Sequence, residues 1–262
     1  MDLNLHGKRA LVCGSSQGIG RACAEQLAAL GASVVLFARD RDKLEAVKPS
    51  LDMSAGQKHG ELVADFAYPA QVKAAVENEL AKGGPFEILI NNTGGPPPGP
   101  AHSAAPQEFI DAFNLHLISN QTLVQALLPG MKAAGYGRVI NIISTSVKQP
   151  LNGLGVSNTV RGAVASWAKT LANELGQFNI TVNNVLPGAT ATVRLEAIIE
   201  GKMQKLGKTR EEVEQAEKAS IPLGRFGEAA EIANAVAFLA SPAASYISGI
   251  NLPVDGGRTG CL

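Results

Sequence analysis

Short apolar runs alternate with longer segments of helical periodicity from one end of this chain to the other, and few folds are compatible with that alternation. The runs are rich in Val, Ile and Leu, as is typical of strands buried on both faces. Strand and helix units in alternation predict a parallel sheet with helices on both sides. The predicted strands are residues 9–14, 32–38, 61–65, 86–91, 138–144, 180–187 and 249–255.

The seven predicted strands fit one α/β domain, a doubly wound Rossmann-type fold spanning residues 1–262. No linker rich in Pro, Gly or Ser divides the chain. Residues 189–220 are charged and predicted to be helical in two pieces, inserted before the last helix–strand unit. Insertions after strand carboxyl ends surround the ligand crevice in such sheets. This segment is therefore predicted to form a lid over the substrate; a plain surface helical hairpin is the alternative.

The charge balance excludes several partners. The chain carries 23 basic and 23 acidic residues, so neither nucleic acid nor an anionic membrane surface is an expected partner. No apolar run approaches the roughly 20 residues needed to cross a bilayer. The three cysteines, Cys13, Cys23 and Cys261, have no metal-ligand spacing, which predicts no metal site and no disulfide framework. With no signal-peptide pattern, a reducing, cytoplasmic location is expected.

A glycine-rich turn joins the first predicted strand to the first predicted helix. Its glycines have the spacing G-x-x-x-G-x-G. Residues without side chains let the backbone approach a pyrophosphate at a helix N-terminus. The turn therefore predicts a dinucleotide site, and close packing alone is the alternative. The assigned residues are Gly14, Ser15, Ser16, Gln17, Gly18, Ile19 and Gly20.

Arg39, directly after the second predicted strand, bears on the choice of nucleotide. An acidic residue at this place would hydrogen-bond the ribose hydroxyls of NAD, whereas an arginine suits the 2′-phosphate of NADP. The sequence therefore favours NADP(H), with NAD(H) as the alternative. Arg39 could also belong to a solvated charge cluster, because charged residues occupy 40–43 as well.

The chain resembles the short-chain dehydrogenase/reductase family, and most of all its 3-oxoacyl-carrier-protein reductases. The resemblance covers essentially the whole length. It implies a Rossmann-type sheet, pyridine-nucleotide chemistry on a small-molecule carbonyl or alcohol, and a homotetramer or homodimer. The matching stretches are CGSSQGIG, AD at 64–65, NNTG at 91–94, GRVINIIS, NNVLPGATAT, IPLGRFGEAAEIANAVAFLAS and GINLPVDGG at 249–257.

The same resemblance implies contacts to the nucleotide. It places Asp65 against the adenine and Asn91 beside the adenosine ribose. It places Pro187 and Gly188 near the nicotinamide and brings Thr192 to the carboxamide. By the same resemblance the remaining cofactor residues are Phe66, Thr93, Gly94, Thr190 and Arg161.

The match fails at the family's catalytic pair, Tyr-x-x-x-Lys, which follows a serine by thirteen residues. Ser144 matches that serine; thirteen residues on stands Ser157, and four more lead to Arg161. Both flanks keep the family pattern, so the residues are substituted and not misaligned. A fourth catalytic position, normally asparagine, falls 28 residues before the serine, on His116.

The substitutions remove the usual proton donor. Ser144 can hydrogen-bond a carbonyl oxygen, and Arg161, expected to keep a pKa above about 12, can stabilise an alkoxide. A serine hydroxyl at position 157 is a poor acid. Our hypothesis is that His116, with an unperturbed pKa of about 6.5, supplies the proton directly or through water and Ser157. The alternatives are a packed helix histidine and, for Lys148 in the following loop, a solvated cation.

Two functions stay open at this point. The first is an NADP(H)-dependent oxidoreductase that reduces a carbonyl or oxidises an alcohol with an altered proton donor. The second is a catalytically impaired nucleotide-binding pseudoenzyme that acts as a sensor or assembly partner. The largely apolar substrate mouth favours a hydrophobic carbonyl compound over a bare sugar. The residues predicted to line this substrate mouth are Pro96, Pro97, Pro98, Val147, Lys148, Leu151 and Leu154.

Overall fold

The computed structural model describes residues 1–261, and in this range the strands form one seven-stranded parallel sheet. Its order is β3-β2-β1-β4-β5-β6-β7, which confirms the predicted fold class and, to within a few residues, all seven predicted strands. The strands are β1 Arg9–Cys13, β2 Ser33–Ala38, β3 Gly60–Val63, β4 Ile88–Asn91, β5 Gly137–Ile142, β6 Ile180–Pro187 and β7 Asn251–Val254.

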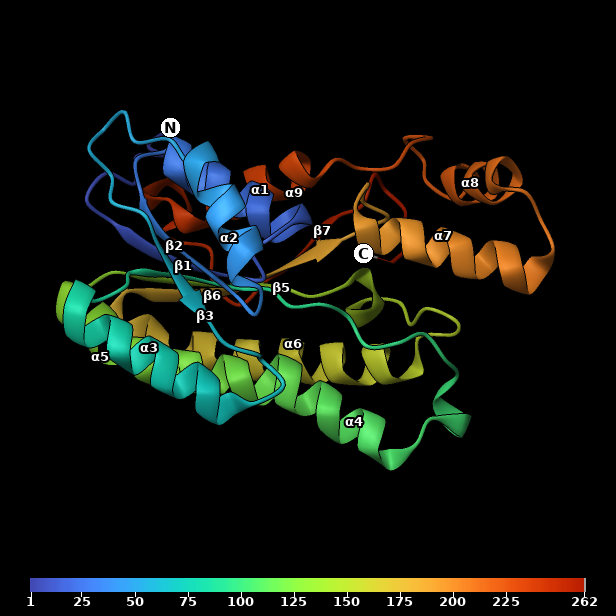
Figure 1. Ribbon diagram of the computed structural model, residues 1–262, viewed down its shortest axis with the longest axis horizontal. Helices are drawn as coiled ribbons and strands as arrows, with labels where there is room; N and C mark the ends of the chain where they lie inside the picture. Colours follow the sequence, from blue (N-terminus) through green and yellow to red (C-terminus); the bar gives the residue numbers. More distant parts are fainter. Residues whose placement is uncertain (262) are drawn as a thin grey trace.

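Helices cover both faces of the sheet (Figure 1). One layer holds α1 Gly18–Ala29, α2 Arg41–Val47 and α9 Ala229–Ala240; the other holds α3 Pro69–Gly83, α4 Pro106–Phe113, α5 Ser119–Ala134 and α6 Gly155–Leu175. Successive residues of β1 face opposite layers: Ala10 and Val12 join one core cluster, whereas Leu11 and Cys13 join the other. Both faces are therefore buried, which is why the strand sequences read as continuous apolar runs.

Two helices stand outside these layers. They are α7 Val193–Leu206 and α8 Arg210–Ala219, which extend to one side of the sheet in Figure 1. They share a small apolar cluster built on Leu195, Ile199 and Val213. The prediction of two helical pieces in 189–220 is confirmed. Among residues 1–261, no helix combines the length and apolar character that a membrane crossing requires.

The chain reverses its direction of travel across the sheet between β1 and β4. From β1 it moves outward to β3, and from β4 it moves the other way to β7. The loops after β1 and β4 therefore leave toward opposite layers and open a crevice at the carboxyl ends of the strands. The predicted site residues that follow strands all lie at this edge.

Asparagine side chains form a hydrogen-bonded ladder across the second half of the sheet. Asn91 donates to Asn141, Asn141 to Asn184, and Asn184 to Asn251, each through its Nδ2 to the next Oδ1 at 2.8 Å. The same residues are backbone neighbours in the parallel register of β4 to β7. A slip of one residue would point the amides to the other face of the sheet, so the ladder favours one register.

We predict that Asn141→Ala destabilises the fold strongly. The change leaves the Asn91 amide and the Asn184 carbonyl oxygen buried without their partners, so the free energy of unfolding should fall by about 2 to 4 kcal/mol. Urea unfolding measures the change. Asn152→Ala, in an exposed turn, is the matched control and should stay within about 0.5 kcal/mol of the parent. Equal unfolding midpoints for the two variants would show that the ladder contributes nothing.

Candidate active site

The glycine turn after β1 is built as the sequence predicts. Gly14 and Gly18 have φ of +60° and +56°, a region that favours glycine. A Cβ on Gly20 would lie 2.2 Å from the carbonyl oxygen of Gly14, so this glycine is required by the close packing of the turn. Because α1 begins at Gly18, its free N–H groups face the crevice.

The open space beside the turn is bounded by two other loops. A Cβ on Gly18 would stand 3.4 Å from Cγ2 of Thr192, so the turn meets the segment after β6. A Cβ on Gly94 would have no atom within 4 Å, so the backbone of the β4 loop faces open space. Nearby, Oδ1 of Asn91 is buried and has no hydrogen-bond donor within residues 1–261. The crevice thus presents the N–H groups at the start of α1, the exposed backbone at Gly94 and the unpaired Oδ1 of Asn91. These groups fit a dinucleotide.

Two of the predicted cofactor residues use their side chains for structure. Oγ of Ser15 is buried and accepts a hydrogen bond from the Phe37 backbone N–H at 2.9 Å. Phe66 is buried in the core with its ring 4.7 Å from that of Phe37, and its carbonyl oxygen accepts from Ser119 Oγ. Only backbone groups of Ser15 and Phe66 can therefore face a ligand.

The loop after β6 is held by its own hydroxyl groups. Thr190 Oγ1 donates to the carbonyl oxygen of Gly188 at 3.1 Å, and Thr192 Oγ1 donates to that of Thr190 at 3.2 Å. A Cβ on Gly188 would lie 2.7 Å from the Asp255 backbone, which explains the glycine after Pro187. The hydroxyl oxygens can still accept a hydrogen bond, so Thr192 keeps the capacity predicted for it.

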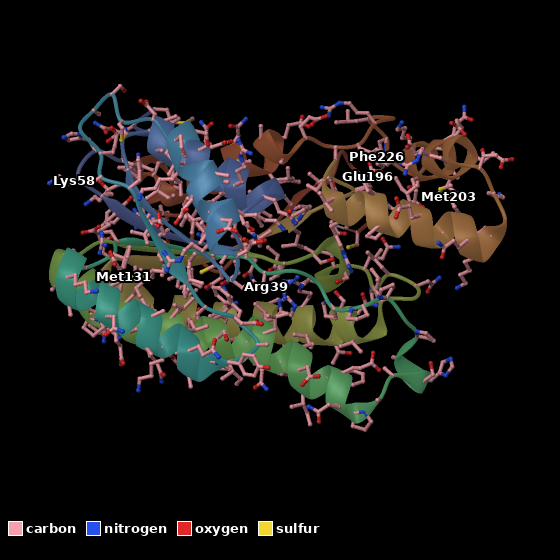
Figure 2. All side chains as sticks on the ribbon, viewed as in Figure 1. Arg39, Lys58, Met131, Glu196, Met203 and Phe226 are labelled. Atoms are coloured by element: carbon pink, nitrogen blue, oxygen red, sulfur yellow. The ribbon has the colours of Figure 1, made fainter. Side chains whose placement is uncertain are left out.

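Arg39 is separate from the charged residues that follow it. Asp40 caps α2 by accepting from the Lys43 backbone N–H at 3.2 Å, and Arg41 pairs with Glu61 at 3.7 Å. Arg39 is exposed and makes no ion pair with any of residues 1–261. Figure 2 shows it between the two helical layers, away from Glu196 on α7. Its guanidinium is available to an anion.

Ser144, Ser157 and Arg161 come together at the carboxyl end of β5. Ser144 follows the strand, and its Oγ accepts a hydrogen bond from the Ser146 backbone N–H at 3.1 Å. Helix α6 carries the other two residues, and Nη1 of Arg161 donates to the carbonyl oxygen of Ile142, the last residue of β5, at 3.1 Å. Ser157 is half-buried, and its hydroxyl makes no hydrogen bond within residues 1–261. The predicted grouping is therefore present.

Arg161 is a buried cation without a counter-ion. Its side chain is 8% exposed, and its Nε has no hydrogen-bond partner. Burial, and then the charge of Arg194, lower the pKa of Arg161 to about 10. The sequence expectation of a value above about 12 was therefore wrong, because it took no account of burial. At neutral pH the guanidinium is still protonated.

His116 lies in a π-helical turn, Asn114–Ile118, that joins α4 to α5. The imidazole is 1% exposed; its Nδ1 is 2.7 Å from Oγ1 of Thr93, and its Nε2 has no partner. Burial, and then the charge of Arg161, lower the pKa of His116 well below 6.5. The expected titration near neutral pH is thus wrong, and the imidazole is uncharged at pH 7. Irregular helical turns of this kind occur frequently at functional sites.

The proline-rich loop after β4 packs on the start of α6. Gly99 donates its N–H to the carbonyl oxygen of Gly153 at 2.7 Å and accepts from Gly155 at 2.9 Å. A Cβ on Gly155 would lie 2.3 Å from the Ala101 nitrogen, so only glycine permits this approach. The loop of Pro96, Pro97 and Pro98 is thereby held beside Leu154, which pairs with Gly99.

Asn158 fixes the other side of the predicted substrate mouth. Its Nδ2 donates to the carbonyl oxygen of Leu151 at 2.8 Å, while its Oδ1 accepts from the Leu151 N–H at 3.4 Å. Lys148 is exposed on the same loop, directly after Val147, the last residue of the short turn that follows Ser144. The structure thus brings the predicted mouth residues together around the start of α6.

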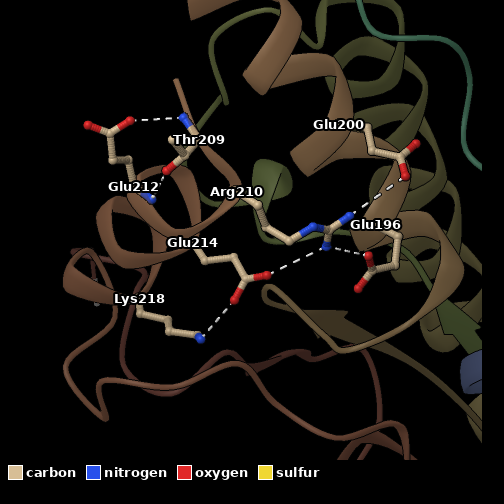
Figure 3. Close-up of polar contacts among 7 residues, drawn as sticks. All are labelled: Glu196, Glu200, Thr209, Arg210, Glu212, Glu214 and Lys218. Atoms are coloured by element: carbon tan, nitrogen blue, oxygen red, sulfur yellow. Dashed lines mark hydrogen bonds and ion pairs between the residues drawn. The ribbon is translucent and has the colours of Figure 1, made fainter. Parts of the chain in front are cut away.

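A charge network also joins α7 and α8, in addition to the buried apolar cluster of Leu195, Ile199 and Val213 (Figure 3). Arg210 of α8 contacts Glu196 at 2.6 Å and Glu200 at 3.7 Å, both on α7, and Glu214 at 3.6 Å on its own helix. Lys218 extends the network to Glu214 at 3.1 Å. These groups are partly exposed, so each pair contributes little, and the buried apolar cluster contributes most of the contact between the two helices.

Arg194, at the start of α7, is a site residue that the sequence analysis missed. Its Nη2 donates to the carbonyl oxygen of Pro96 at 2.9 Å, so it ties α7 to the loop after β4. In the sequence, the only feature that could have indicated Arg194 is its basic side chain two positions after Thr192. Nothing in the local sequence pairs it with a loop almost one hundred residues earlier.

Comparison with known proteins assigns this geometry to a family. A family model described as enoyl-(acyl carrier protein) reductase matches residues 14–259. The 3-oxoacyl-[acyl-carrier-protein] reductase FabG of Escherichia coli (strain K12) is 35% identical over 255 residues, covering 97% of this chain and 98% of the relative. The chain belongs to the short-chain dehydrogenase/reductase family. The predicted resemblance and the enzyme class, an oxidoreductase of this family, are confirmed.

Solved structures of the same family superpose closely. L-Sorbose reductase from Gluconobacter frateurii, complexed with NADPH and L-sorbose, has a TM-score of 0.93 with 34% identity, covering 100% of both chains. The 3-ketoacyl-(acyl-carrier-protein) reductase from Brucella melitensis, complexed with NADH, has a TM-score of 0.83 with 33% identity, covering 98% of this chain and 100% of the other. The fold of these structures is therefore shared over essentially the whole of this chain.

We predict that His116 stays uncharged at pH 6.5, where an exposed histidine is half protonated. The unfolded chain takes up a proton below this pH and the folded chain does not. The free energy of unfolding should therefore fall as the pH drops below about 6.5. NMR of the imidazole C–H signals, assigned with His116→Gln, gives the pKa directly.

Stability measurements supply the control for this prediction. His116→Gln should lose less stability than the parent between neutral pH and pH 5, because the variant lacks this linkage. A His116 signal that titrates near 6.5, with parallel stability curves for the two proteins, would contradict the low pKa.

Proposed function

We propose that the chain is an NADP(H)-dependent oxidoreductase that interconverts a carbonyl and an alcohol without the usual catalytic tyrosine. The observation that carries the proposal is the meeting of Ser144, Ser157 and Arg161 at the end of β5. The glycine turn and Thr192 border the same crevice. Relatives described as reductases, one complexed with NADPH and one with NADH, support the choice of chemistry.

The residues around the crevice suit a nicotinamide nucleotide. The turn from Gly14 to Gly20 would hold its pyrophosphate, Arg39 its 2′-phosphate, and Asp65 and Asn91 its adenosine. Thr93, Gly94, Pro187 and Thr190 belong to the loops that would border it. Such a cofactor, when bound, gives or takes a hydride.

Residues of this chain would bind the oxygen of the substrate and stabilise its developing charge. In reduction, the carbonyl carbon gains a hydride and the oxygen gains a proton, so negative charge develops on the oxygen. The Ser144 hydroxyl would hydrogen-bond this oxygen, and the buried Arg161 would stabilise its charge from a low-dielectric position. Ser157 would add a second hydroxyl on the same side.

The proton needs a different source from that of the family. Tyr136 lies before β5, at the opposite end of that strand from Ser144, and donates to the Ala240 carbonyl oxygen. Tyr246 precedes β7, and Tyr68 follows β3, which is separated from β5 by three other strands. We propose that His116, uncharged at neutral pH, relays a proton from solvent.

A second candidate function rests on the same observation. Without a tyrosine at the site, and with an uncharged His116, the chain would bind nucleotide and turn over nothing. It would then serve as a sensor or assembly partner. Nucleotide binding is common to both functions, so turnover alone separates them.

The remaining features of the proposal concern organisation. We propose a single domain over residues 1–262, in which 189–220 closes over the substrate as a lid beside Lys148, Leu151 and Leu154. Helices α7 and α8 share their own apolar cluster and stand outside the helical layers, which suits a segment that moves as a unit. We further propose a cytoplasmic homotetramer or homodimer; the free thiols of Cys13 and Cys23 fit a reducing compartment.

We predict that Arg161→Gln lowers kcat by about 10²-fold, because the cation that stabilises the developing charge is lost. Arg161→Lys should retain most of the rate, and Ser166→Ala, exposed on the same helix, should match the parent. A screen of carbonyl compounds with NADPH at several pH values measures turnover, and fluorescence titration measures NADPH binding separately. Tight binding with no turnover of any compound by the parent would establish the sensor and exclude the oxidoreductase.

We predict that Arg39→Ala weakens NADPH binding by about tenfold, or about 1.4 kcal/mol, and leaves NADH binding unchanged. The 2′-phosphate would lose its cation, and NADH has no such phosphate. Arg41→Ala is the matched control, because Arg41 is paired with Glu61. An equal loss for both nucleotides would mean that Arg39 does not read the 2′-phosphate.

A further inference from the structure

Two arginines of the site have no acidic partner. Neither Arg161 nor Arg194 makes an ion pair with any of residues 1–261. Most other arginines of the described chain do have such a partner: Arg9, Arg21, Arg41, Arg210, Arg225 and Arg258. The site is therefore positively charged within a chain whose formal net charge is zero.

The two guanidinium groups reach the crevice from different elements. Arg194 comes from the first turn of α7 and is fixed to the Pro96 carbonyl oxygen at 2.9 Å. Arg161 comes from α6 and is fixed to the Ile142 carbonyl oxygen at 3.1 Å. Each of these bonds uses one of five guanidinium N–H donors, so donors remain on both side chains.

Buried polar atoms in the same place also lack partners. Nε of Arg161 and Nε2 of His116 are both buried and unpaired, on side chains 8% and 1% exposed. His116 is held by Thr93, which stands three residues before Pro96 on the loop that Arg194 contacts. Unpaired polar nitrogens on nine-tenths buried side chains cost stability unless a ligand occupies them.

The electrostatics are consistent with an absent anion. The charge of Arg194 contributes to the lowered pKa of Arg161, and no carboxylate opposes this shift. Arg161 is buried and has no counter-ion within residues 1–261, which is unfavourable, whereas Arg194 is exposed and open to a ligand from solvent. An anion bound by Arg194 would reduce the repulsion between the two guanidinium groups.

We propose that the substrate is a carbonyl compound that carries a carboxylate, which Arg194 binds while Ser144 and Arg161 face the carbonyl oxygen. The inference rests on the proposed function for its reaction and adds the charge of the substrate. The apolar residues Leu151 and Leu154 at the mouth would contact the rest of the molecule. Arg194 is thus the residue that distinguishes an oxo acid from its neutral ester.

Binding without turnover tests the anion site first. Malonate, titrated calorimetrically into the protein saturated with NADP⁺, should bind, whereas the neutral malonamide should not. Arg194→Gln should weaken malonate binding by about tenfold. Lys82→Gln, which removes a positive charge from the exposed end of α3, should bind malonate like the parent.

The cofactor diphosphate is the other anion that Arg194 could meet. NADPH affinity should be the same for Arg194→Gln and the parent. If the variant loses NADPH affinity by a similar factor, and malonate competes with NADPH, then Arg194 serves the diphosphate and the proposed carboxylate site is wrong.

Turnover separates this inference from the proposed function. Acetoacetate and ethyl acetoacetate form an acid and ester pair, and Arg194→Gln should lower kcat/KM for the acid by about tenfold while sparing the ester. If Arg194→Gln changes kcat/KM for the acid and for the ester by the same factor, the inference is wrong and the proposed oxidoreductase activity is unaffected. Malonate binding that depends on Arg194, with no turnover of any compound, would overturn the oxidoreductase and leave the carboxylate site standing.

Discussion

Side-chain amides of Asn91, Asn141, Asn184 and Asn251 join strands β4 to β7 through a continuous row of hydrogen bonds. Backbone pairing alone permits parallel strands to slip, whereas a buried amide that loses its neighbour is costly. The row therefore sets how far each strand extends toward the crevice. Because the loops after β4, β5 and β6 start from these strand ends, their mutual distances follow from this register.

The chemistry of the site depends on how two buried groups affect each other. The charge of Arg161 helps keep His116 uncharged. A protonated imidazole beside a buried guanidinium would place two cations in a low-dielectric region, which is unfavourable. The residue at position 161 thus affects the pKa at position 116, and the roles proposed for the two residues have to be considered together.

Much of the fold, and the location of the site, could be predicted from the sequence. Strand periodicity and the spacing around Gly14, Gly18 and Gly20 are local patterns, and counting from Ser144 located Ser157 and Arg161. The pKa values and long-range contacts of these groups could not be predicted from local patterns. Burial, which lowers the pKa of Arg161, arises from elements far apart in the sequence, and so does the contact between Arg194 and Pro96.

In the proposed reaction, the uncharged imidazole would bear differently on the two directions. A general base must be deprotonated before it can act, and His116 meets this condition at neutral pH, although its lowered pKa also makes it a weaker base. In reduction, the same imidazole would first have to receive a proton from solvent. Acidification should therefore slow alcohol oxidation only when the pH approaches the lowered pKa, so the pH range of the oxidising direction would extend below that of an exposed histidine.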